Sequence, residues 1–196
     1  MATINIKGEL TDLSQPLVMG ILNVTPDSFY LQSRKQSEEE IIGRVSQIID
    51  EGGKIIDIGA QSSNPKSDLL PPDVEIERLR FALDIINRQF PSATISADVA
   101  RFCVEEHGVS IINDISGGEI DKNMFDMVAR LNVPYILMHM RGTPQTMQQQ
   151  TYYTNFIQEV FFYFSSKIAD LHQRGVNDII IDPGFGFGKS LDQNYE

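Results

Sequence analysis

The sequence predicts an α/β fold with a parallel sheet, and it favours a (β/α)8 barrel of which about six β/α units are present. Short apolar runs alternate along the chain with amphipathic helical stretches, and the turns between them are short. This alternation is typical of parallel strands joined by right-handed crossovers. Polar residues stand at the C-terminal ends of at least five of the runs: Asn23, Asp98, Asn113, His139 after Met138, and Asp182.

These strand-end residues distinguish two arrangements of a parallel sheet. In a barrel, the loops after all strands surround one mouth, and barrel active sites lie there. In a doubly wound open sheet, only the loops beside the switch point meet a ligand. Because the polar residues are spread over five strands, we favour the barrel.

The elements are expected in a regular order. A short exposed strand or hairpin within residues 3–10 precedes strands at 17–23, 55–58, 94–98, 111–115, 135–138 and 178–182. Ser37 is expected to cap the first helix, with Glu38–Glu40 in its first turn and a buried stripe of Ile41, Val45, Ile48 and Ile49. A second helix is expected from Asp73, with Ile76, Leu79, Leu83 and Ile86 on one face. Further helices are expected at 101–106, at 121–131 and over about 154–174, where the phenylalanines (Phe156, Phe161, Phe162, Phe164) are interpreted as helical core.

The length of the chain indicates a single domain over residues 1–196. A complete barrel needs eight strands and typically ~250 residues. The sequence ends where the helix after the sixth strand should begin. We therefore expect a barrel domain that is incomplete at its C-terminus.

Composition limits the classes of partner. The formal net charge of −11 argues against a nucleic acid or an anionic membrane as the main ligand. Cys103 is the single cysteine, so neither an internal disulfide nor a cysteine-based zinc site is expected. No apolar run approaches the ~20 residues of a membrane span, and the N-terminus is short, polar and alternating, unlike a signal peptide. A cytoplasmic location is therefore expected.

The stretch from Ile179 to Ser190 is the most distinctive in the chain. An apolar β-branched run stops at Asp182, and Pro183 then precedes three glycines spaced two apart. Such glycines let the backbone approach a flat ligand, and Phe185 and Phe187 can cover one. The ending Gly-Lys-Ser suggests a phosphate-binding P-loop, but that pattern needs a glycine at position 183, which is proline.

Asp98, Asp182 and the amide of Asn113 are expected to form an acceptor-rich floor lined by Met138 and Phe187. Buried carboxylates need donors. A heterocycle with a guanidine-like edge, such as a pterin or guanine, supplies paired N–H donors. The alternative is that the strand-end Asp and Asn residues only cap the next helices.

Two further side chains at strand ends, Asn23 and His139, are expected to have roles of their own. The amide oxygen of Asn23 is a suitable hard ligand for Mg²⁺ when a phosphate supplies the other ligands. His139 is more often structural than catalytic in such a place. No Ser-His or Cys-His arrangement is evident.

Four motifs resemble those of the dihydropteroate synthase family. They are Met19–Phe29 (MGILNVTPDSF), Ile112–Gly118 (INDISGG), Leu137–Met140 with Gly142–Pro144, and Asp182–Lys189 (DPGFGFGK). The similarity runs along the whole chain. It implies a TIM barrel that joins 6-hydroxymethyl-7,8-dihydropterin diphosphate to p-aminobenzoate in folate synthesis, in a family targeted by sulfonamides. The expected partners are these small molecules, and a homodimer is compatible with the family.

The resemblance also implies residue roles. The pterin pocket maps onto Asp98, Asn113, Met138, Asp182 and Phe187, and Asp98 and Asp182 are also the catalytic residues that stabilise a cationic pterin. Asn23 matches the residue that helps to hold Mg²⁺ and diphosphate. Phe29, Ser63 and Gly186 match positions near the p-aminobenzoate.

The chain departs from the family pattern at several places. Ser63-Asn64-Pro65 stands where the family usually has Thr-Arg-Pro, the segment after Phe29 lacks the usual Asp-Gly-Gly, and Val99 replaces a threonine. The family's last two strands, which carry a lysine that contacts the pterin and an anion site, are missing. An alternative function therefore stays open: a non-catalytic pterin-binding homologue, or the pterin-binding domain of a methyltransferase.

Overall fold

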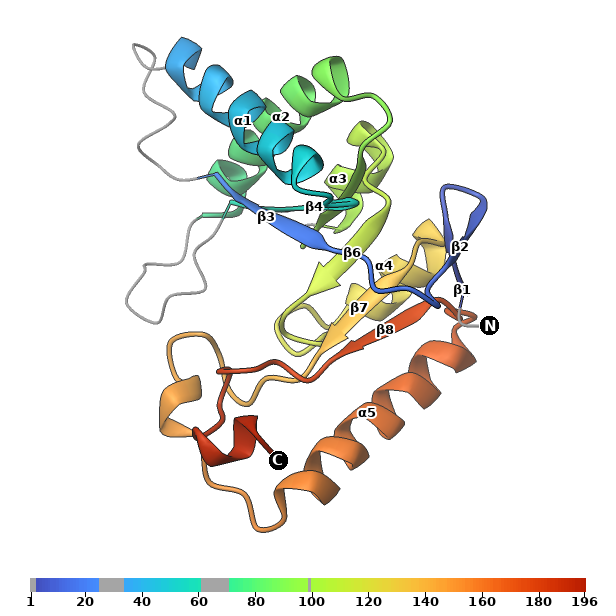
Figure 1. Ribbon diagram of the computed structural model, residues 1–196. Coiled ribbons are helices and arrows are strands. Elements are labelled where there is room, and N and C mark those ends of the chain that lie inside the picture. Colours follow the sequence, from blue (N-terminus) through green and yellow to red (C-terminus); the bar gives the residue numbers. More distant parts are fainter. Residues whose placement is uncertain (1–2, 25–33, 61–70, 99) are drawn as a thin grey trace. The chain divides into compact units, whose positions relative to one another are not determined.

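The computed structural model describes residues 3–24, 34–60, 71–98 and 100–196 of the chain (Figure 1). These residues form two compact units. The first unit holds the described residues up to Ile112, and the second holds those from Asn113 to Glu196. In the described residues, no helix combines the length and the apolar composition that a membrane crossing requires.

The chain begins with a β-hairpin in the first unit. Its strands β1 (Thr3–Ile6) and β2 (Glu9–Asp12) pair antiparallel. Lys7 and Gly8 connect them, both with positive φ, at 53° and 85°. A two-residue turn of this kind matches the twist of the strands it joins. The expected N-terminal hairpin is confirmed.

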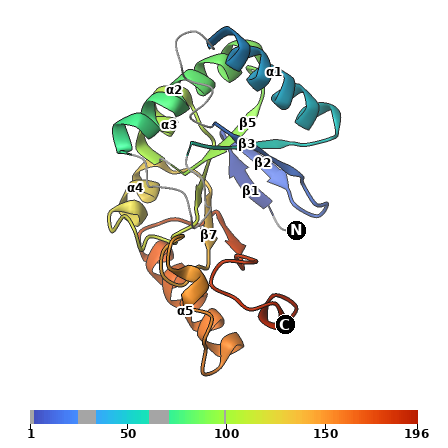
Figure 2. The same ribbon diagram turned by 90° about the vertical axis from the view of Figure 1, so that its left-hand side faces the viewer.

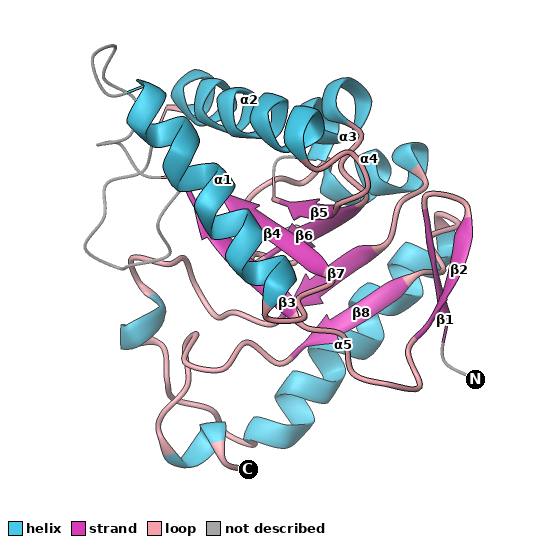
Figure 3. Ribbon diagram, turned by 45° about the horizontal axis from the view of Figure 1, so that its top comes forward, coloured by secondary structure: helices cyan, strands magenta, loops and turns pink. Residues whose placement is uncertain are grey.

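Six parallel strands follow: β3 (Met19–Asn23), β4 (Ile55–Gly59), β5 (Thr94–Ala97), β6 (Ile111–Asp114), β7 (Tyr135–Met138) and β8 (Ile179–Asp182). Figure 3 shows them as magenta arrows. They are ordered in the sheet as in the chain. A doubly wound sheet reverses its order at a switch point, whereas a barrel wall does not. The predicted α/β class and the preference for a partial barrel are therefore confirmed.

Helices connect successive strands. They are α1 (Arg34–Asp50), α2 (Pro72–Gln89), α3 (Ala100–His107), α4 (Met124–Leu131) and α5 (Phe156–Gln173), with short 3₁₀ helices η2 (Met147–Gln149) and η3 (Asp192–Asn194). In the first unit, α1 packs against α2 and α2 against α3 (Figure 2). Asn155 caps α5 by accepting a hydrogen bond from the backbone N–H of Gln158 at 3.2 Å.

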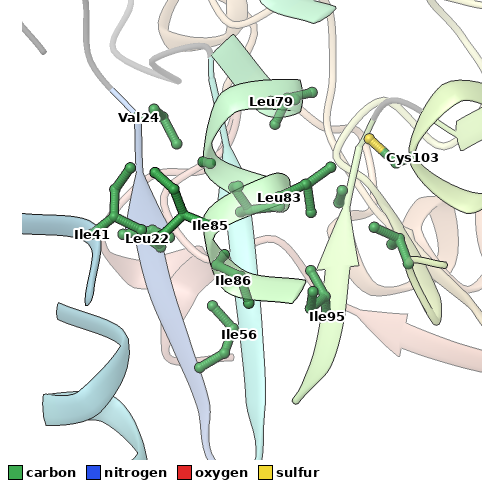
Figure 4. Close-up of a cluster of buried hydrophobic side chains, with 14 of the residues drawn as sticks. Leu22, Val24, Ile41, Ile56, Leu79, Leu83, Ile85, Ile86, Ile95 and Cys103 are labelled. Carbon is green, nitrogen blue, oxygen red and sulfur yellow. The ribbon is translucent and has the colours of Figure 1, made fainter. Parts of the chain in front are cut away.

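The core of the first unit lies between its strands and its helices. Figure 4 shows apolar side chains of β3, β4 and β5 facing those of α2, among them Leu22, Ile56, Ile95, Leu79, Leu83 and Ile86. Every one of these side chains is at most 4% exposed. The predicted stripe of α2 is thereby confirmed.

The start of α1 was predicted wrongly. The helix begins at Arg34, so Ser37 lies within it and Glu38–Glu40 lie beyond its first turn. Ser37 is 2% exposed and precedes the buried Ile41 by four residues, so it extends the buried stripe instead of capping the helix. Ile49 is 43% exposed and does not belong to that stripe.

The aromatic face of α5 also differs from the prediction. Phe164 is buried, but Phe161 and Phe162 are 71% and 75% exposed. Consecutive helical residues are about 100° apart around the axis, so neighbouring phenylalanines cannot all face the same core. The interpretation of all four as helical core was wrong for these two.

Candidate functional site

The first unit has a sheet face directed away from its helices. Leu22, Ile56 and Ile95 belong to the core against the helices. Because successive side chains of a strand point to opposite faces, the residues next to them point away from the helices. On that face, the Oγ of Ser96 on β5 donates a hydrogen bond to Asp57 on β4. A carboxylate therefore already lies on this face, below the strand ends.

Asn23 and Asp98 continue this face at the C-terminal ends of the strands. Asn23 pairs in register with Gly59, and Ile58 pairs with Ala97. Asp98 follows Ala97, so it stands level with Gly59 and two strands away from Asn23. Gly59 contributes no side chain between the two. Asn23 is exposed and Asp98 half-buried, and both therefore lie at one level of the same sheet edge.

Asn23 also borders a hollow of about 490 Å³ that Ser37, Glu40 and Arg44 of α1 help to line. Arg44 is directed towards the strand, where its Nε donates to the carbonyl oxygen of Ile21 at 3.3 Å. Asn23 therefore borders open space that Glu40 and Arg44 of the neighbouring helix also line.

In the second unit, the consecutive residues Asn113 and Asp114 end β6 and point to opposite faces. Asp114 is 5% exposed. Its carboxylate accepts four hydrogen bonds at 2.7 Å, from the N–H and hydroxyl of Ser116, the N–H of Gly118 and the hydroxyl of Tyr135. Tyr135 packs edge-on against α4. Asp114 thus holds the turn after β6 on the helix side, and the half-buried Asn113 belongs to the other face.

Met138 and Asp182 stand side by side where β7 and β8 end. They are register partners in the parallel ladder. The N–H of His139 donates to the carbonyl oxygen of Asp182 at 3.0 Å and extends the pairing by one step. Paired residues of neighbouring strands share a face, so the Asp182 carboxylate lies beside the Met138 thioether.

The glycine-rich turn after β8 folds back over this pair. The Oδ1 of Asp182 accepts the N–H of Gly184 at 2.8 Å, and the N–H of Phe187 donates to the carbonyl of Gly184 at 3.0 Å. The half-buried Phe187 packs against a buried methionine cluster of Met138, Met140 and Met147. Asp182, Met138 and Phe187 are therefore brought together.

The rest of the turn is held by side chains from its surroundings. Gly186 donates its N–H to the Oδ1 of Asn194 at 2.7 Å, and its carbonyl accepts from Gln148 at 3.1 Å. The hydroxyl of Tyr153 donates to the carbonyl of Gly188 at 2.9 Å. Phe185, expected to help cover a ligand, is 66% exposed and lies outside the methionine cluster. Only Phe187 of the two phenylalanines packs there.

Lys189 and His139 form a buried pair that the sequence did not predict. Lys189 is 6% exposed and His139 4%, and the Lys189 Nζ lies 2.9 Å from the His139 Nδ1. Burial, together with the Lys189 charge, lowers the pKa of His139 to about 4. Burial lowers the pKa of Lys189 to about 8, with Asp182 acting in the opposite direction. The sequence offers one signal for this pair, the lysine that ends the glycine run. In the sequence analysis this lysine was interpreted only as a possible phosphate ligand.

Helix α5 supports the turns after β6 and β7. The hydroxyl of Tyr163 donates to the carbonyl oxygen of Met138 at 3.0 Å. Lys167 donates to the carbonyl oxygen of Gly117 at 2.7 Å and to Glu119. Hydrogen bonds from Lys122 and Lys167 lower the pKa of Glu119 to about 2. The helix therefore fixes the backbone that carries the strand-end residues of the second unit.

Several predicted positions lie outside the described residues. Phe29 and Ser63, expected near the second substrate, are among them. So are Asn64 and Val99, two of the departures from the family pattern. Of the remaining candidates, Asn23 and Asp98 belong to the first unit, whereas Asn113, Met138, Asp182, Gly186 and Phe187 belong to the second.

The arrangement in the second unit has a definite chemical character. A half-buried carboxylate accepts hydrogen bonds, while a thioether and an aromatic ring beside it offer flat apolar contact. This combination suits a planar ring with N–H groups along one edge. In the part of the chain that the structure describes, no group of three or more His, Cys, Asp and Glu residues could hold a metal ion.

Comparison with known proteins agrees with this character. A family model described as pterin binding enzyme matches residues 19–196. The folic acid synthesis protein fol1 of Pneumocystis carinii is 40% identical over 186 residues, which cover 91% of this chain and 25% of that protein. The dihydropteroate synthase of Escherichia coli (strain K12) is 36% identical over 195 residues, which cover 96% of this chain and 68% of that enzyme. The chain thus spans a quarter of one relative and about two thirds of the other.

Two solved structures are similar along nearly the whole chain. The Yersinia pestis dihydropteroate synthase in complex with a sulfonamide drug has a TM-score of 0.83 at 31% identity, over 99% of this chain and 72% of that chain. The Xanthomonas albilineans dihydropteroate synthase with 4-aminobenzoic acid has a TM-score of 0.82 at 32% identity, over 98% of this chain and 70% of that chain. The resemblance inferred from the sequence motifs is confirmed.

Proposed function

The chain belongs to the pterin binding enzyme family, and on that premise we propose that it is a dihydropteroate synthase. The reaction condenses 6-hydroxymethyl-7,8-dihydropterin diphosphate with p-aminobenzoate to give 7,8-dihydropteroate and diphosphate. It is a transferase reaction of folate, and hence tetrahydrofolate, biosynthesis. The similarity to the Escherichia coli and Yersinia pestis synthases over 96% and 99% of this chain supports the proposal.

The observation that carries the proposal is the grouping of Asp182, Met138 and Phe187. The guanidine-like edge of a pterin presents two parallel N–H donors, which a carboxylate accepts as a pair. The thioether and the phenyl ring supply apolar contact for the ring. We assign pterin binding to these three residues and to Asn113, and in the first unit to Asp98.

The proposed chemistry is a substitution at the pterin methylene carbon. The bond from this carbon to the diphosphate oxygen breaks, and its electron pair leaves with the diphosphate. The carboxylates of Asp98 and Asp182 stabilise the positive charge that develops on the pterin. The nitrogen lone pair of p-aminobenzoate then forms the new C–N bond, and the amine proton passes to solvent. No protein nucleophile takes part.

We extend the proposal to Mg²⁺, which would neutralise charge on the leaving diphosphate when bound. The amide oxygen of Asn23 would hold it, since this residue is exposed and borders the hollow beside α1. Mg²⁺ is usually held by one or two protein ligands together with substrate phosphates and water. A single amide at a strand end fits that pattern.

The remaining parts of the proposal rest on the sequence. Phe29, Ser63 and Gly186 are assigned to the p-aminobenzoate side, and of these Gly186 is exposed on the glycine-rich turn. Residues 1–196 are proposed to act as one barrel domain that a full-length synthase would complete. A cytoplasmic location and a homodimer complete the proposal.

The test is diphosphate release from the pterin diphosphate, measured with and without p-aminobenzoate and with and without Mg²⁺. Release that needs both substrates is expected. The matched control is Asp182→Asn, which keeps the shape of the side chain but removes its charge.

Three outcomes would contradict the proposal or one of its parts in different ways. A chain that binds 6-hydroxymethylpterin but releases no diphosphate would fit the alternative, a pterin-binding homologue or a methyltransferase domain. A folded chain that neither binds 6-hydroxymethylpterin nor releases diphosphate would refute the assignment of a pterin site. Equal release from the chain and from Asp182→Asn would exclude the assigned role of Asp182.

A further inference from the structure

Lys189 is enclosed by acceptors that come from both ends of the glycine-rich turn and from the end of β7. Its Nζ lies 3.0 Å from the carbonyl oxygens of Gly184 and Phe187 and 3.1 Å from that of His139. The fourth neighbour is the Nδ1 of His139, at 2.9 Å. A single side chain thus joins the start of the turn, its end and the adjacent strand.

The chemistry of the pair fixes its protonation. An ammonium group donates three hydrogen bonds and accepts none, so the Nδ1 of His139 must be an acceptor and the ring must be neutral. The lowered pKa of His139 agrees with that state. The charged or titratable groups that act on the pair are Asp182, which favours the ammonium, and Arg141, which disfavours a charged His139.

Two tyrosines also face the histidine ring. The rings of Tyr163 and His139 meet edge to face with centroids 4.8 Å apart, and Tyr153 lies 6.2 Å away. Burial raises the pKa of both phenols, so both stay neutral while Lys189 titrates. Lys189 is therefore the group of this cluster that changes charge just above neutral pH.

We propose that Lys189 is a positioning residue, whose ammonium clamps the glycine-rich turn onto the end of β7 and so holds Phe187 against Met138 beside Asp182. The four acceptors around Nζ occupy its three protons. No donor is left for a substrate phosphate, which separates this role from that of a P-loop lysine. The consequence for pterin binding rests on the proposed function, whereas the clamp itself does not.

The close packing at the turn makes the clamp effective. A Cβ atom on Gly184 would lie 2.2 Å from the carbonyl oxygen of His139, so the backbones of the turn and of β7 are already in contact there. That carbonyl is one of the three that Lys189 holds. Without the ammonium, the Gly184 carbonyl keeps the N–H of Phe187, whereas the carbonyl oxygens of His139 and Phe187 lose the donor that Lys189 supplies. We therefore expect the turn to move apart.

The test compares Lys189→Met with Lys167→Met. Lys167 is the matched control because it too donates to a backbone carbonyl of a strand-end turn, at 2.7 Å, with 15% of its side chain exposed. Asp114 holds that turn independently. The readouts are titration with 6-hydroxymethylpterin and the hydrogen-exchange protection of the Phe187 amide, with the Asn132 amide at the end of α4 as an internal reference.

We expect Lys189→Met to bind the pterin about tenfold more weakly at pH 7 and to lose at least about tenfold in Phe187 protection. Lys167→Met should change neither by more than about twofold.

Unchanged Phe187 protection in Lys189→Met would overturn the clamp, whatever the pterin affinity. If the unmodified chain binds no pterin, the proposed function fails, and Phe187 protection still decides the clamp. If Lys189→Met does not fold, Lys189→Gln decides, because its amide offers fewer donors than the three carbonyl oxygens need. Its Phe187 protection should then fall relative to that of Asn132, and a constant ratio would overturn the proposal.

Discussion

Asp182 is the direct register partner of Met138, so a carboxylate and a buried thioether leave neighbouring strand ends on the same face. Met138 is 3% exposed, and Asp182 is half-buried. A ligand that reaches the carboxylate must therefore also contact an apolar wall. As a ligand, this pairing favours a flat ring with N–H donors along one edge over a small polar ion.

The first prediction concerns Asp182→Asn. The amide keeps the acceptor that Gly184 uses at 2.8 Å, so the turn should hold. The amide loses the charge and presents its N–H₂ group to the N–H donors of the pterin. The binding free energy should therefore weaken by about 2–3 kcal/mol, or about 30- to 150-fold in pterin affinity. Titration with 6-hydroxymethylpterin measures it.

Asp178→Asn is the control for this prediction. Asp178 precedes the same strand at its opposite end, four residues from Asp182, and therefore on the same face. Its substitution should leave pterin affinity unchanged. Equal affinities for Asp182→Asn and the unmodified chain would refute the pocket assignment.

The second prediction contrasts two glycines of one turn. Gly184 and Gly186 both have positive φ, at 68° and 81°. A Cβ on Gly184 would lie 2.2 Å from the His139 carbonyl oxygen, whereas one on Gly186 would meet nothing within 4 Å. Gly186→Ala should cost about 1–2 kcal/mol for its backbone conformation. Gly184→Ala should cost about 1–3 kcal/mol more through the close contact.

Urea unfolding of both variants measures this difference. Because the two positions share the same conformational strain, the difference isolates the contact between the turn and β7. Equal midpoints would mean that the turn can move away from His139 without cost.

Much of this architecture follows from local patterns in the sequence. Strands and helix stripes were predictable because burial imposes periods of two and of about 3.6 residues, as at Leu79, Leu83 and Ile86. The strand-end positions of Asp98 and Asp182 followed from the same reasoning. The boundary of α1 did not, because Ser37 is equally compatible with a cap and with a buried position inside the helix.

Contacts between distant residues could not be predicted in this way. His139 and Lys189 are fifty residues apart, and nothing in either local stretch specifies their contact. Asn113 and Asp114 look alike in sequence as polar residues at a strand end. Only the four donors around Asp114 identify it as the one that faces the helices.

The third prediction tests that distinction with two Tyr→Phe substitutions. Tyr135→Phe leaves the buried Asp114 carboxylate with three donors instead of four and should cost about 1–3 kcal/mol. Tyr163→Phe removes a hydrogen bond to the neutral carbonyl of Met138 and should cost about 0.5–1.5 kcal/mol. Denaturant unfolding provides both values.

Pterin affinity supplies the second half of this prediction. Asp114 lies on the helix side of the sheet, so Tyr135→Phe should leave pterin affinity within about twofold of the unmodified chain. A large loss of affinity without a loss of stability would place Asp114, and not Asn113, at the ligand.

The last prediction is a loss of stability in acid that originates at His139. Burial and the neighbouring Lys189 charge lower its pKa from 6.5 to about 4. Between these values the unfolded chain binds a proton that the folded chain does not, so stability is complete above pH 6.5 and is lost as the pH falls towards 4. The full difference corresponds to roughly 3 kcal/mol. Urea midpoints measured from pH 7.5 to 4 follow it.

His139→Gln should remove this slope, and His172→Gln should keep it, because His172 is exposed in the last turn of α5. Glu119, whose pKa is lowered from 4.5 to about 2, contributes only below pH 4.5. Burial raises the pKa of Glu75 above 4.5, so this carboxyl acts in the window from 6.5 to 4.5 with the opposite sign. The difference in slope between the unmodified chain and His139→Gln therefore isolates the histidine. If His139→Gln retained the dependence of stability on pH in this window, that dependence would not originate at His139. The histidine would then accept a proton in the folded chain as readily as in the unfolded chain, and its Nδ1 could not be the acceptor that Lys189 requires.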